Sequence, residues 1–550
     1  MSEPRVRRSD LLVAAILTLG ILGPAVLRPG YILRGDMVFV PDQPWKPAWL
    51  GLDGSVPRSV PMDAIVWLFG QVLPGDVVQK LFLAASLLIL ALGVAHVLRH
   101  LGVVARVAAM TFACWNPWVY ERLAIGQWAC VLGLAALPWL VSAVVRRRSA
   151  AVAVWLLVAG VAAPSMGLIA VVVAVAVAAT QHWTWRSWLA LLGLSLAANA
   201  PWIMPALLRG GLEAPAGQFA GFGATAESGA GTLASVLSLG GIWKTSVVPA
   251  ERTSAALVVV AVGVSLAALA ALARRRGHVP GATGLLVAAL ASLILAAAPL
   301  NTLLADIARG VPAIGILRDS TRYLAPAVLA VALGFGLLVE EAVRRAKLAA
   351  ALAALPVALL PSMAWGLHAF LEPSQYPSSW SAARTAMESH GVAPSVVLPW
   401  RGSYRGFAWT DGHAVLDPAP RFFPGDVLVD DRTFLSNRVI ASEDPYLQRV
   451  AGALAFADPS SALRSLGIRW VIVEKGLLVD GARPQGTVTF DSPDLTLLDL
   501  GSPGPNQRPT PTVWLVVAAD ITAFAQFFPI LLRNRVTRVT VRNNPGGRNT

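Results

Sequence analysis

The residue best suited to chemistry is Asp36, which lies in the stretch Tyr31–Lys46 after the first apolar segment. It follows a glycine, and aromatic and proline residues come after it. A carboxylate just past a membrane helix can meet a lipid-borne substrate and accept a proton from it. The alternative is that Asp36 only caps a turn, because Gly-Asp pairs are common in turns. Asp42 is a less favoured second acid in the same loop.

Two arginines near a later apolar segment could bind phosphate. Arg318 and Arg322 are four residues apart, which predicts that they share one face of a helix at the membrane surface. Guanidinium groups bind phosphate oxygens in a fork geometry, so this pair is the candidate site for a lipid phosphate. The alternative is a surface ion cluster with Asp319.

Glu121, Arg122 and Tyr323 are further candidates for substrate contacts. The first two follow the aromatic stretch Trp115–Tyr120 at the end of the third apolar segment. The alternative is an aromatic belt in which Glu121 and Arg122 neutralise each other. Either way, the three residues are expected on the same side of the membrane as Asp36.

Several common chemistries lack their sequence marks. The chain has no GxxxxGK[ST] phosphate loop, no HExxH helix and no nucleophile elbow, which argues against ATP-driven transport and the common hydrolases. The seven histidines form no ligand cluster, and Cys114 and Cys130 lie in or beside apolar segments. The cofactor is undetermined, and a divalent metal is open.

The composition sets the fold class. With 56% hydrophobic and 14% charged residues among 550, the chain is too apolar for a soluble protein. We expect an α-helical polytopic membrane protein with about twelve transmembrane helices. The formal net charge is +13, but the basic residues lie in short clusters between apolar segments, where they set orientation rather than bind nucleic acid. The expected spans lie near residues 10–28, 80–98, 105–121, 126–145, 150–180 (two passages), 187–208, 254–273, 280–299, 322–342, 347–367 and 512–532.

The count depends on residues 150–180, which are interrupted at Ala163–Gly167. Two passages there place all the basic clusters on one side, as the positive-inside rule requires, whereas one passage places Arg274–Arg276 outside. Twelve passages in the plasma membrane put both termini in the cytoplasm.

The polar regions between the spans define the expected domains. A bundle at 1–369 carries a long first outer loop at 29–79, with a short amphipathic helix near Met62–Gly70. A small extracytoplasmic α/β domain is expected at 370–511, with a last transmembrane helix at 512–532 and a cytoplasmic tail at 533–550. The expected elements of the α/β domain are strands at Ser395–Trp400 and Gly467–Val473, a hairpin of Thr487–Phe490 with Leu495–Leu500, and a helix within Asp458–Gly467.

With these features the chain resembles the GT-C superfamily of membrane glycosyltransferases, which includes mycobacterial arabinofuranosyltransferases. The likeness lies in the many spans, the acid in a long first outer loop and the C-terminal extracytoplasmic domain. It implies a polyprenyl-phosphate sugar donor and gives Asp36 the role of base or metal ligand. The paired acids of several members are not clear here, because Asp36 and Asp42 are six residues apart. The Ala-, Val- and Arg-rich composition indicates a high-GC bacterium of actinobacterial type.

The expected function is therefore a glycosyltransferase that moves a sugar from a polyprenyl-phosphate donor to an envelope glycan or glycolipid acceptor on the outer face of the membrane. Membrane lipids are the expected surroundings, and no nucleic acid is involved. Two other classes stay open: a lipid or glycolipid flippase or transporter, and a non-catalytic envelope assembly protein.

Overall fold

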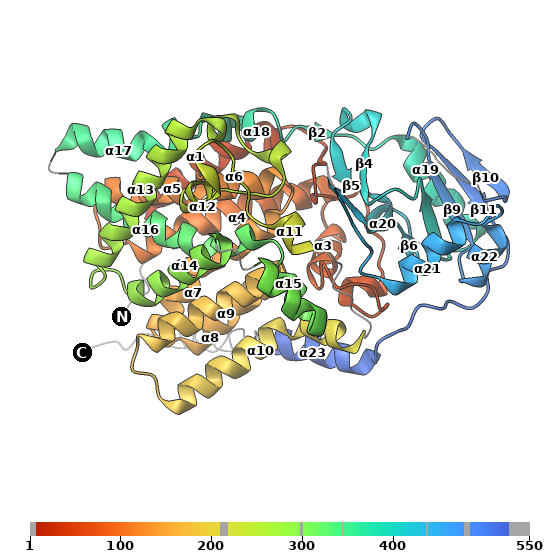
Figure 1. Ribbon diagram of the computed structural model, residues 1–550, viewed down its shortest axis with the longest axis horizontal. Helices are drawn as coiled ribbons and strands as arrows, with labels where there is room; N and C mark the ends of the chain where they lie inside the picture. Colours follow the sequence, from red (N-terminus) through yellow and green to blue (C-terminus); the bar gives the residue numbers. More distant parts are fainter. Residues whose placement is uncertain are drawn as a thin grey trace, which may run out of the picture.

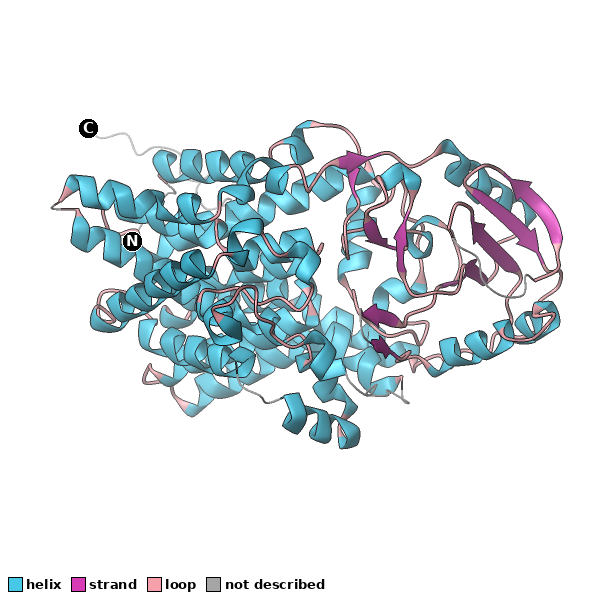
Figure 2. Ribbon diagram, turned by 45° about the horizontal axis from the view of Figure 1, so that its top comes forward, coloured by secondary structure: helices cyan, strands magenta, loops and turns pink. Residues whose placement is uncertain are grey.

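The computed structural model describes residues 7–209, 218–297, 301–343, 345–435, 438–477 and 484–526. A bundle of helices occupies one side of the molecule, and most of the strands lie on the other side (Figures 1 and 2). The chain is mostly helical, as expected. We call residues 373–499 the strand region.

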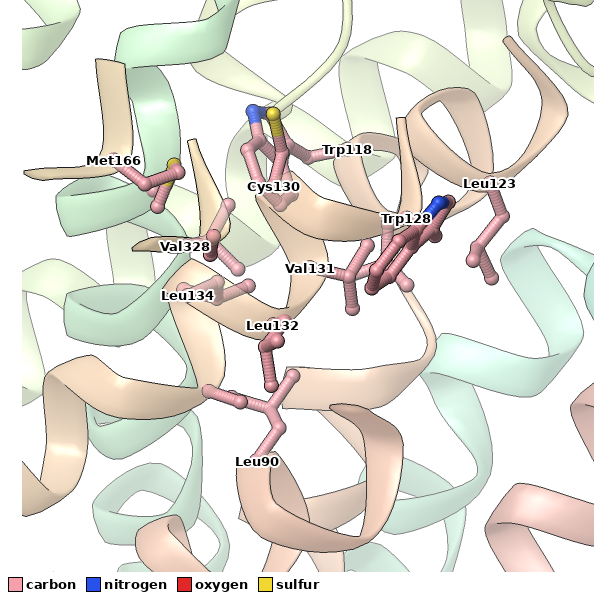
Figure 3. Close-up of a cluster of buried hydrophobic side chains, with 14 of the residues drawn as sticks. Leu90, Trp118, Leu123, Trp128, Cys130, Val131, Leu132, Leu134, Met166 and Val328 are labelled. Carbon is pink, nitrogen blue, oxygen red and sulfur yellow. The ribbon is translucent and has the colours of Figure 1, made fainter. Parts of the chain in front are cut away.

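Three long apolar helices form the centre of the bundle: α4 (Gly75–Val97), α7 (Trp128–Val145) and α16 (Ala325–Ala342). Because α7 and α16 are apolar on every face, they are buried by neighbours all round. Figure 3 shows part of this core, in which side chains of α7 lie among those of neighbouring helices: Leu90, Trp118, Leu123, Trp128, Cys130, Val131, Leu132, Leu134, Met166 and Val328.

Five described helices are long and apolar enough to cross a membrane, or six if a pair bent by 70° at Leu360 counts as one span. This confirms a mostly helical protein with several candidate membrane spans, while twelve passages remain a prediction. The five are α4, α7, α10 (Trp185–Leu208), α13 (Ala255–Arg274) and Ser320–Ala342, and the bent pair is Ala346–Leu359 with Pro361–His368. Shorter apolar helices are α8 (Ser149–Ala162), α9 (Pro164–Ala179), α14 (Ala282–Ala297) and α23 (Val513–Ala525). The other helices of this part are α1 (Arg8–Leu22), α2 (Pro24–Leu27), α3 (Met62–Gly70), α5 (Val103–Cys114), α6 (Pro117–Ala124), α11 (Gln218–Phe222), α12 (Gly231–Leu237), α15 (Asn301–Gly310), α17 (Ala346–Leu359) and α18 (Ala364–His368).

The third predicted span, 105–121, is not one helix. Helix α5 ends at Cys114, and α6 begins at Pro117. Asn116 starts the new helix because its side-chain oxygen accepts a hydrogen bond of 3.1 Å from the Val119 amide, with proline in the first position. Helix α6 is therefore a separate helix, and it carries Glu121 and Arg122.

The predicted break within residues 150–180 is confirmed. Ala163 has extended backbone angles, and it separates α8 from α9. The two helices pack closely, since a Cβ on Gly167 would lie 2.9 Å from the Cα of Gly160. Residues 149–179 thus form a tight helical pair.

Two arginines, Arg274 and Arg275, lie together at one end of the bundle. At the last turn of α16, Glu341 binds Arg274 at 3.3 Å and Arg275 at 3.0 Å. Residue Arg322 precedes α16, and this helix of 18 residues is about 27 Å long. Arg274 and Arg275 therefore lie at the opposite end of the bundle from Arg322.

The strand region contains a five-stranded sheet in the order β10-β11-β9-β3-β6. Its centre is the parallel pair β3 and β9, and all strands and the hairpin predicted in this region are confirmed. The sheet strands are β3 (Ser395–Leu398), β6 (Val427–Leu428), β9 (Trp470–Glu474), β10 (Thr487–Asp491) and β11 (Leu495–Asp499). The other strands form the pairs β1 (Tyr31–Ile32) with β2 (Pro373–Ser374), β4 (Tyr404–Gly406) with β5 (Ala414–Leu416), and β7 (Thr433–Leu435) with β8 (Arg438–Ile440).

Helices cover both faces of this sheet. Val396 of β3 packs with Leu463 of α22 on one face, while Val397 belongs to the core that contains Trp380 of α19. Successive residues face opposite sides because side chains alternate along a strand. The helices are α19 (Ser378–His390), α20 (Ala419–Phe422), α21 (Pro445–Leu454) and α22 (Ser460–Ser465), the last of which confirms the helix predicted within Asp458–Gly467.

Candidate active site

Asp36 is fixed by a close approach of two glycine turns. Its amide donates a hydrogen bond of 2.8 Å to the carbonyl oxygen of Ile125, just after α6. Gly35 has φ +51° and Gly126 has φ +88°. A Cβ on Gly126 would lie 2.3 Å from the Met37 nitrogen, so only glycine allows this contact. The first loop is thereby attached to the end of α6.

Two side chains donate hydrogen bonds to the Asp36 carboxylate. Gln127 Nε2 donates to Oδ2 at 3.1 Å, and the Tyr404 hydroxyl donates to Oδ1. Burial and the neighbouring Asp36 charge hold the pKa of Tyr404 well above its usual range, so its hydroxyl keeps its proton at neutral pH. Each oxygen keeps a lone pair that can accept a further proton.

Tyr404 reaches Asp36 because a hairpin from the strand region lies against Gly35. The Gly35 amide donates to the Ala414 carbonyl at 2.9 Å, and the Leu416 amide donates to the Gly35 carbonyl at 2.7 Å. The ammonium of Lys244 lies 5.1 Å from the centroid of the Tyr404 ring. The site is therefore built from the bundle and the strand region together.

Arg122 organises the buried side of the site. Its guanidinium is fully buried and donates to Gln127 Oε1 at 2.6 Å, to Asp319 Oδ2 at 3.0 Å and to Thr321 Oγ1 at 2.5 Å. Because the Gln127 oxygen is occupied by Arg122, the Gln127 amide nitrogen is the group that faces Asp36. The hydrogen-bond partners of Arg122 are these three residues rather than its neighbour Glu121, since adjacent residues of a helix point to different sides.

Glu121 belongs to a different cluster. It is fully buried and faces Glu227, which accepts a 2.9 Å hydrogen bond from Arg252 Nε. Tyr323 is also buried and donates to the Ile316 carbonyl at 3.0 Å. Neither Glu121 nor Tyr323 lines the cavity described next.

Asp36 and Arg322 line one cavity of about 150 Å³. Arg322 Nη2 lies 3.2 Å from Asp319 Oδ2, and its Nε has no hydrogen-bond partner among the described residues. Ala163, at the turn between α8 and α9, also lines this space. We call it the Asp36 cavity, and its lining is Asp36, Val38, Phe39, Arg58, Ser59, Met62, Asp63, Val66, Gly126, Gln127, Trp128, Ala129, Cys130, Ala162, Ala163, Arg322 and Arg421.

Arg318 does not join Arg322 in the cavity. The expected shared helical face is wrong, because the backbone leaves the helical conformation at Asp319 (φ −85°, ψ 81°) between two short 3-10 helices, Pro312–Leu317 and Ser320–Leu324. Arg318 instead binds Glu443 of the strand region and stacks 5.0 Å above the Phe222 ring centroid.

Asp42 lies outside the cavity as well. Its side chain is 72% exposed, and its Oδ2 lies 3.2 Å from Arg384 Nη2. The cavity has a different second acid, Asp63, whose two oxygens accept hydrogen bonds of 3.1 and 3.0 Å from Arg421. Burial raises the pKa of Asp63, and Arg421 opposes that rise.

The sequence does not single out Gln127, Tyr404, Arg58, Asp63 or Arg421 as members of one site. Gln127 is close to Glu121 and Arg122 in sequence, which is the only local signal. Tyr404 and Arg421 lie more than 350 residues after Asp36 and Asp63, so their proximity depends on how the strand region meets the loop.

The residues around Asp36 do not fit a metal site of two carboxylates. The second acid of the cavity, Asp63, already accepts hydrogen bonds from Arg421 on both oxygens. Among the described residues, no group of three or more His, Cys, Asp or Glu side chains is placed to hold a metal ion.

Comparison with known proteins places the fold. No protein-family model matches the chain, and no curated protein matches it. Among solved structures, it is similar to the cryo-EM structure of arabinofuranosyltransferase AftD from mycobacteria, with TM-score 0.56 and 17% identity over 92% of this chain and 40% of that one. A mutant of AftD gives the same TM-score and identity, with 42% of its chain covered. This chain thus spans less than half the length of AftD.

The resemblance expected from the sequence is confirmed at the level of fold: over 92% of its length, the chain has a fold similar to that of the mycobacterial arabinofuranosyltransferase AftD.

Proposed function

We propose that the protein is a membrane glycosyltransferase that moves a sugar from a polyprenyl-phosphate donor to an envelope glycan or glycolipid acceptor. One observation carries the proposal: a carboxylate and a guanidinium, Asp36 and Arg322, line the same cavity. Glycosyl transfer from a lipid phosphate needs both groups, one for a proton and one for the leaving phosphate.

In the proposed reaction, an acceptor hydroxyl attacks the anomeric carbon of the donor sugar. Asp36 takes the hydroxyl proton as the new carbon–oxygen bond forms. The bond from the anomeric carbon to the phosphate oxygen breaks, and the phosphate leaves with the electron pair. Arg322 binds the phosphate oxygens and stabilises their charge. The Nε of its guanidinium, which has no hydrogen-bond partner in the described part of the chain, supports this role.

Tyr404 and Gln127 position Asp36 in this proposal. Their hydrogen bonds hold one lone pair of each carboxylate oxygen, so the remaining lone pairs have fixed directions. Arg122 acts indirectly: it binds Gln127, which binds Asp36, and Asp319, which binds Arg322. The two halves of the site are held in one buried network.

The orientation that fits this function places the Asp36 cavity and the strand region on the extracytoplasmic side of the plasma membrane. The opposite end of the bundle, with Arg274 and Arg275, would face the cytoplasm, as the positive-inside rule requires. We propose twelve passages with both termini cytoplasmic, a bundle at 1–369, an extracytoplasmic domain at 370–511 and a last helix at 512–532.

Reconstitution into lipid vesicles tests the function. The name of AftD makes a polyprenyl-phosphate arabinofuranose the first donor to supply, with other polyprenyl-phosphate sugars beside it. We expect sugar to move from the lipid to an added glycan. Movement of intact lipid-linked sugar across the bilayer without transfer would instead identify a flippase, and neither event with any donor would favour an assembly protein.

A further inference from the structure

A second and larger cavity lies between the first loop and the strand region. Its volume of about 610 Å³ is within the range of roughly 300–1,000 Å³ that is usual for ligand pockets. We call it the Trp45 cleft. The lining residues used below are Trp45, Lys46 and Asp53 of the loop with Val392, Asp426 and Arg508 of the C-terminal part.

The Trp45 cleft adjoins the Asp36 cavity. Four residues line both spaces: Arg58, Ser59, Asp63 and Arg421. The ion pair of Asp63 with Arg421 therefore forms part of a common wall. One end of a ligand that filled the cleft would therefore lie beside the Asp36 cavity.

The charged side chains of the cleft favour hydroxyl groups over phosphate. The cleft is lined by six aspartates and by four basic side chains, Lys46, Arg58, Arg421 and Arg508. Asp53, Asp426 and Asp444 lie 3.6, 3.1 and 3.0 Å from the guanidinium of Arg508, and Asp444 also lies 3.1 Å from Arg209. This excess of carboxylates repels an anion, while carboxylate oxygens accept hydrogen bonds from neutral hydroxyls. The buried Arg508 side chain also has an Nε without a hydrogen-bond partner among the described residues, so one donor is left for a ligand.

An aromatic side chain adds a flat apolar surface to the cleft. Trp45 is 45% exposed, and its ring packs against Trp67 with centroids 4.7 Å apart, which fixes its position. The apolar face of a sugar ring can stack on such an indole, while its hydroxyls reach polar groups around it. The lining also contains apolar side chains, among them Trp49, Val392 and Leu447. A lipid tail that filled the cleft would remove the aspartates and arginines beside them from water, which is costly.

We infer that the Trp45 cleft binds a neutral oligosaccharide and directs its end past the Asp63–Arg421 pair toward Asp36. The oligosaccharide is the acceptor in the proposed reaction. That acceptor role rests on the proposed function, whereas binding of the oligosaccharide in the cleft does not.

Direct binding to the purified full-length protein in nanodiscs tests this inference. The probes are neutral arabinan, mannan and glucan pentasaccharides, and calorimetry measures their affinity. Trp45→Ala removes the stacking surface, and Val392→Trp fills the cleft from an exposed position. We expect each change to weaken binding of the best pentasaccharide by roughly tenfold or more, since a tenfold change needs only the loss of about one good contact.

Two matched variants change exposed residues of the strand region outside the cleft: Phe456→Ala and Val488→Trp. They should bind the pentasaccharide as the wild type does. Asp36→Asn should also bind it normally, because Asp36 does not line the cleft.

The outcomes separate this inference from the proposed function. Binding that survives both cleft changes, or no binding of any pentasaccharide, overturns the cleft site even if the protein transfers sugar. If both cleft variants lose pentasaccharide binding and the wild-type protein transfers no sugar, the cleft site is supported and the proposed glycosyltransferase function is overturned. Tighter binding of phospholipid vesicles than of any pentasaccharide, lost in the same variants, would assign the cleft to a lipid instead.

Discussion

The side-chain nitrogen of Gln127 lies 3.1 Å from Asp36 Oδ2, and the side-chain oxygen of Gln127 lies 2.6 Å from Arg122 Nη1. One amide therefore connects a carboxylate that faces the cavity to a guanidinium that is fully buried. Arg122 also binds Asp319, which binds Arg322. The two groups proposed to act on the substrate are held by this one chain of contacts.

Arg122→Leu should destabilise the protein strongly. It leaves the buried Asp319 carboxylate with less compensation, and breaking a buried ion pair typically costs about 3–5 kcal/mol. The measurement is the thermal unfolding midpoint of the purified protein. Arg309→Gln is the control, since the Arg309–Asp306 pair is exposed and is expected to contribute at most about 1 kcal/mol. Equal midpoints for the two variants would contradict the organising role of Arg122.

Arg322→Gln should weaken donor binding. Loss of a hydrogen bond to a charged group costs about 1.5–3 kcal/mol, which is roughly a 10- to 150-fold lower affinity. Equilibrium binding of a polyprenyl phosphate to the purified variant measures it. Arg318→Gln serves for comparison, because Arg318 binds Glu443 rather than lining the cavity. A larger loss in Arg318→Gln than in Arg322→Gln would restore Arg318 as the phosphate ligand.

Lys46 should make stability depend on pH. Burial lowers the pKa of Lys46 to about 7, and its Nζ donates a 2.6 Å hydrogen bond to the Pro420 carbonyl. The unfolded chain keeps its ordinary pKa near 10.4, so between these values the unfolded state binds more protons and the free energy of unfolding rises with pH. Lys46→Met carries no charge. Its unfolding midpoint should exceed that of the wild type, by a larger difference at pH 6 than at pH 9. The same difference at both pH values would show that folding does not change the pKa of Lys46.

Reporter fusions test the orientation. Fusions at Ser149 and Arg274 should report the cytoplasm, and a fusion at Gly402 in the strand region should report the outside. An outside signal at Arg274 would remove the twelve-passage topology, because that residue lies at the opposite end of the bundle from Arg322.

Local signals were sufficient for much of the fold. Helix α22 follows Asp458, whose carboxylate accepts a 3.0 Å hydrogen bond from the Ser460 amide, and it is followed by Gly467 with φ +88°. Both residues act within a few positions of the helix, so their effect is readable from sequence. The break at Ala163 was predictable for the same reason, since Pro164 cannot continue the preceding helix.

The site was only partly predictable because its contacts are distant in sequence. Asp36 was singled out by its place after an apolar segment, and the structure gives it Tyr404 as a partner 368 positions away. No local pattern encodes that pairing. For Arg318 and Arg322 a local pattern was misleading. A four-residue spacing places two residues on one helical face only where the backbone between them is helical, and at Asp319 the backbone is not helical.

The most direct measurement is the transfer rate of Asp36→Asn in vesicles supplied with donor and acceptor. Asparagine keeps the size of the side chain and can still accept from Tyr404, but it is not a base. The rate should fall by roughly two to four orders of magnitude, the usual contribution of a positioned acid or base, while donor affinity changes far less. Asp42→Asn, on an exposed aspartate, should transfer at the wild-type rate. A rate in Asp36→Asn equal to that of the wild type would contradict the catalytic role of Asp36 and leave it as a turn residue.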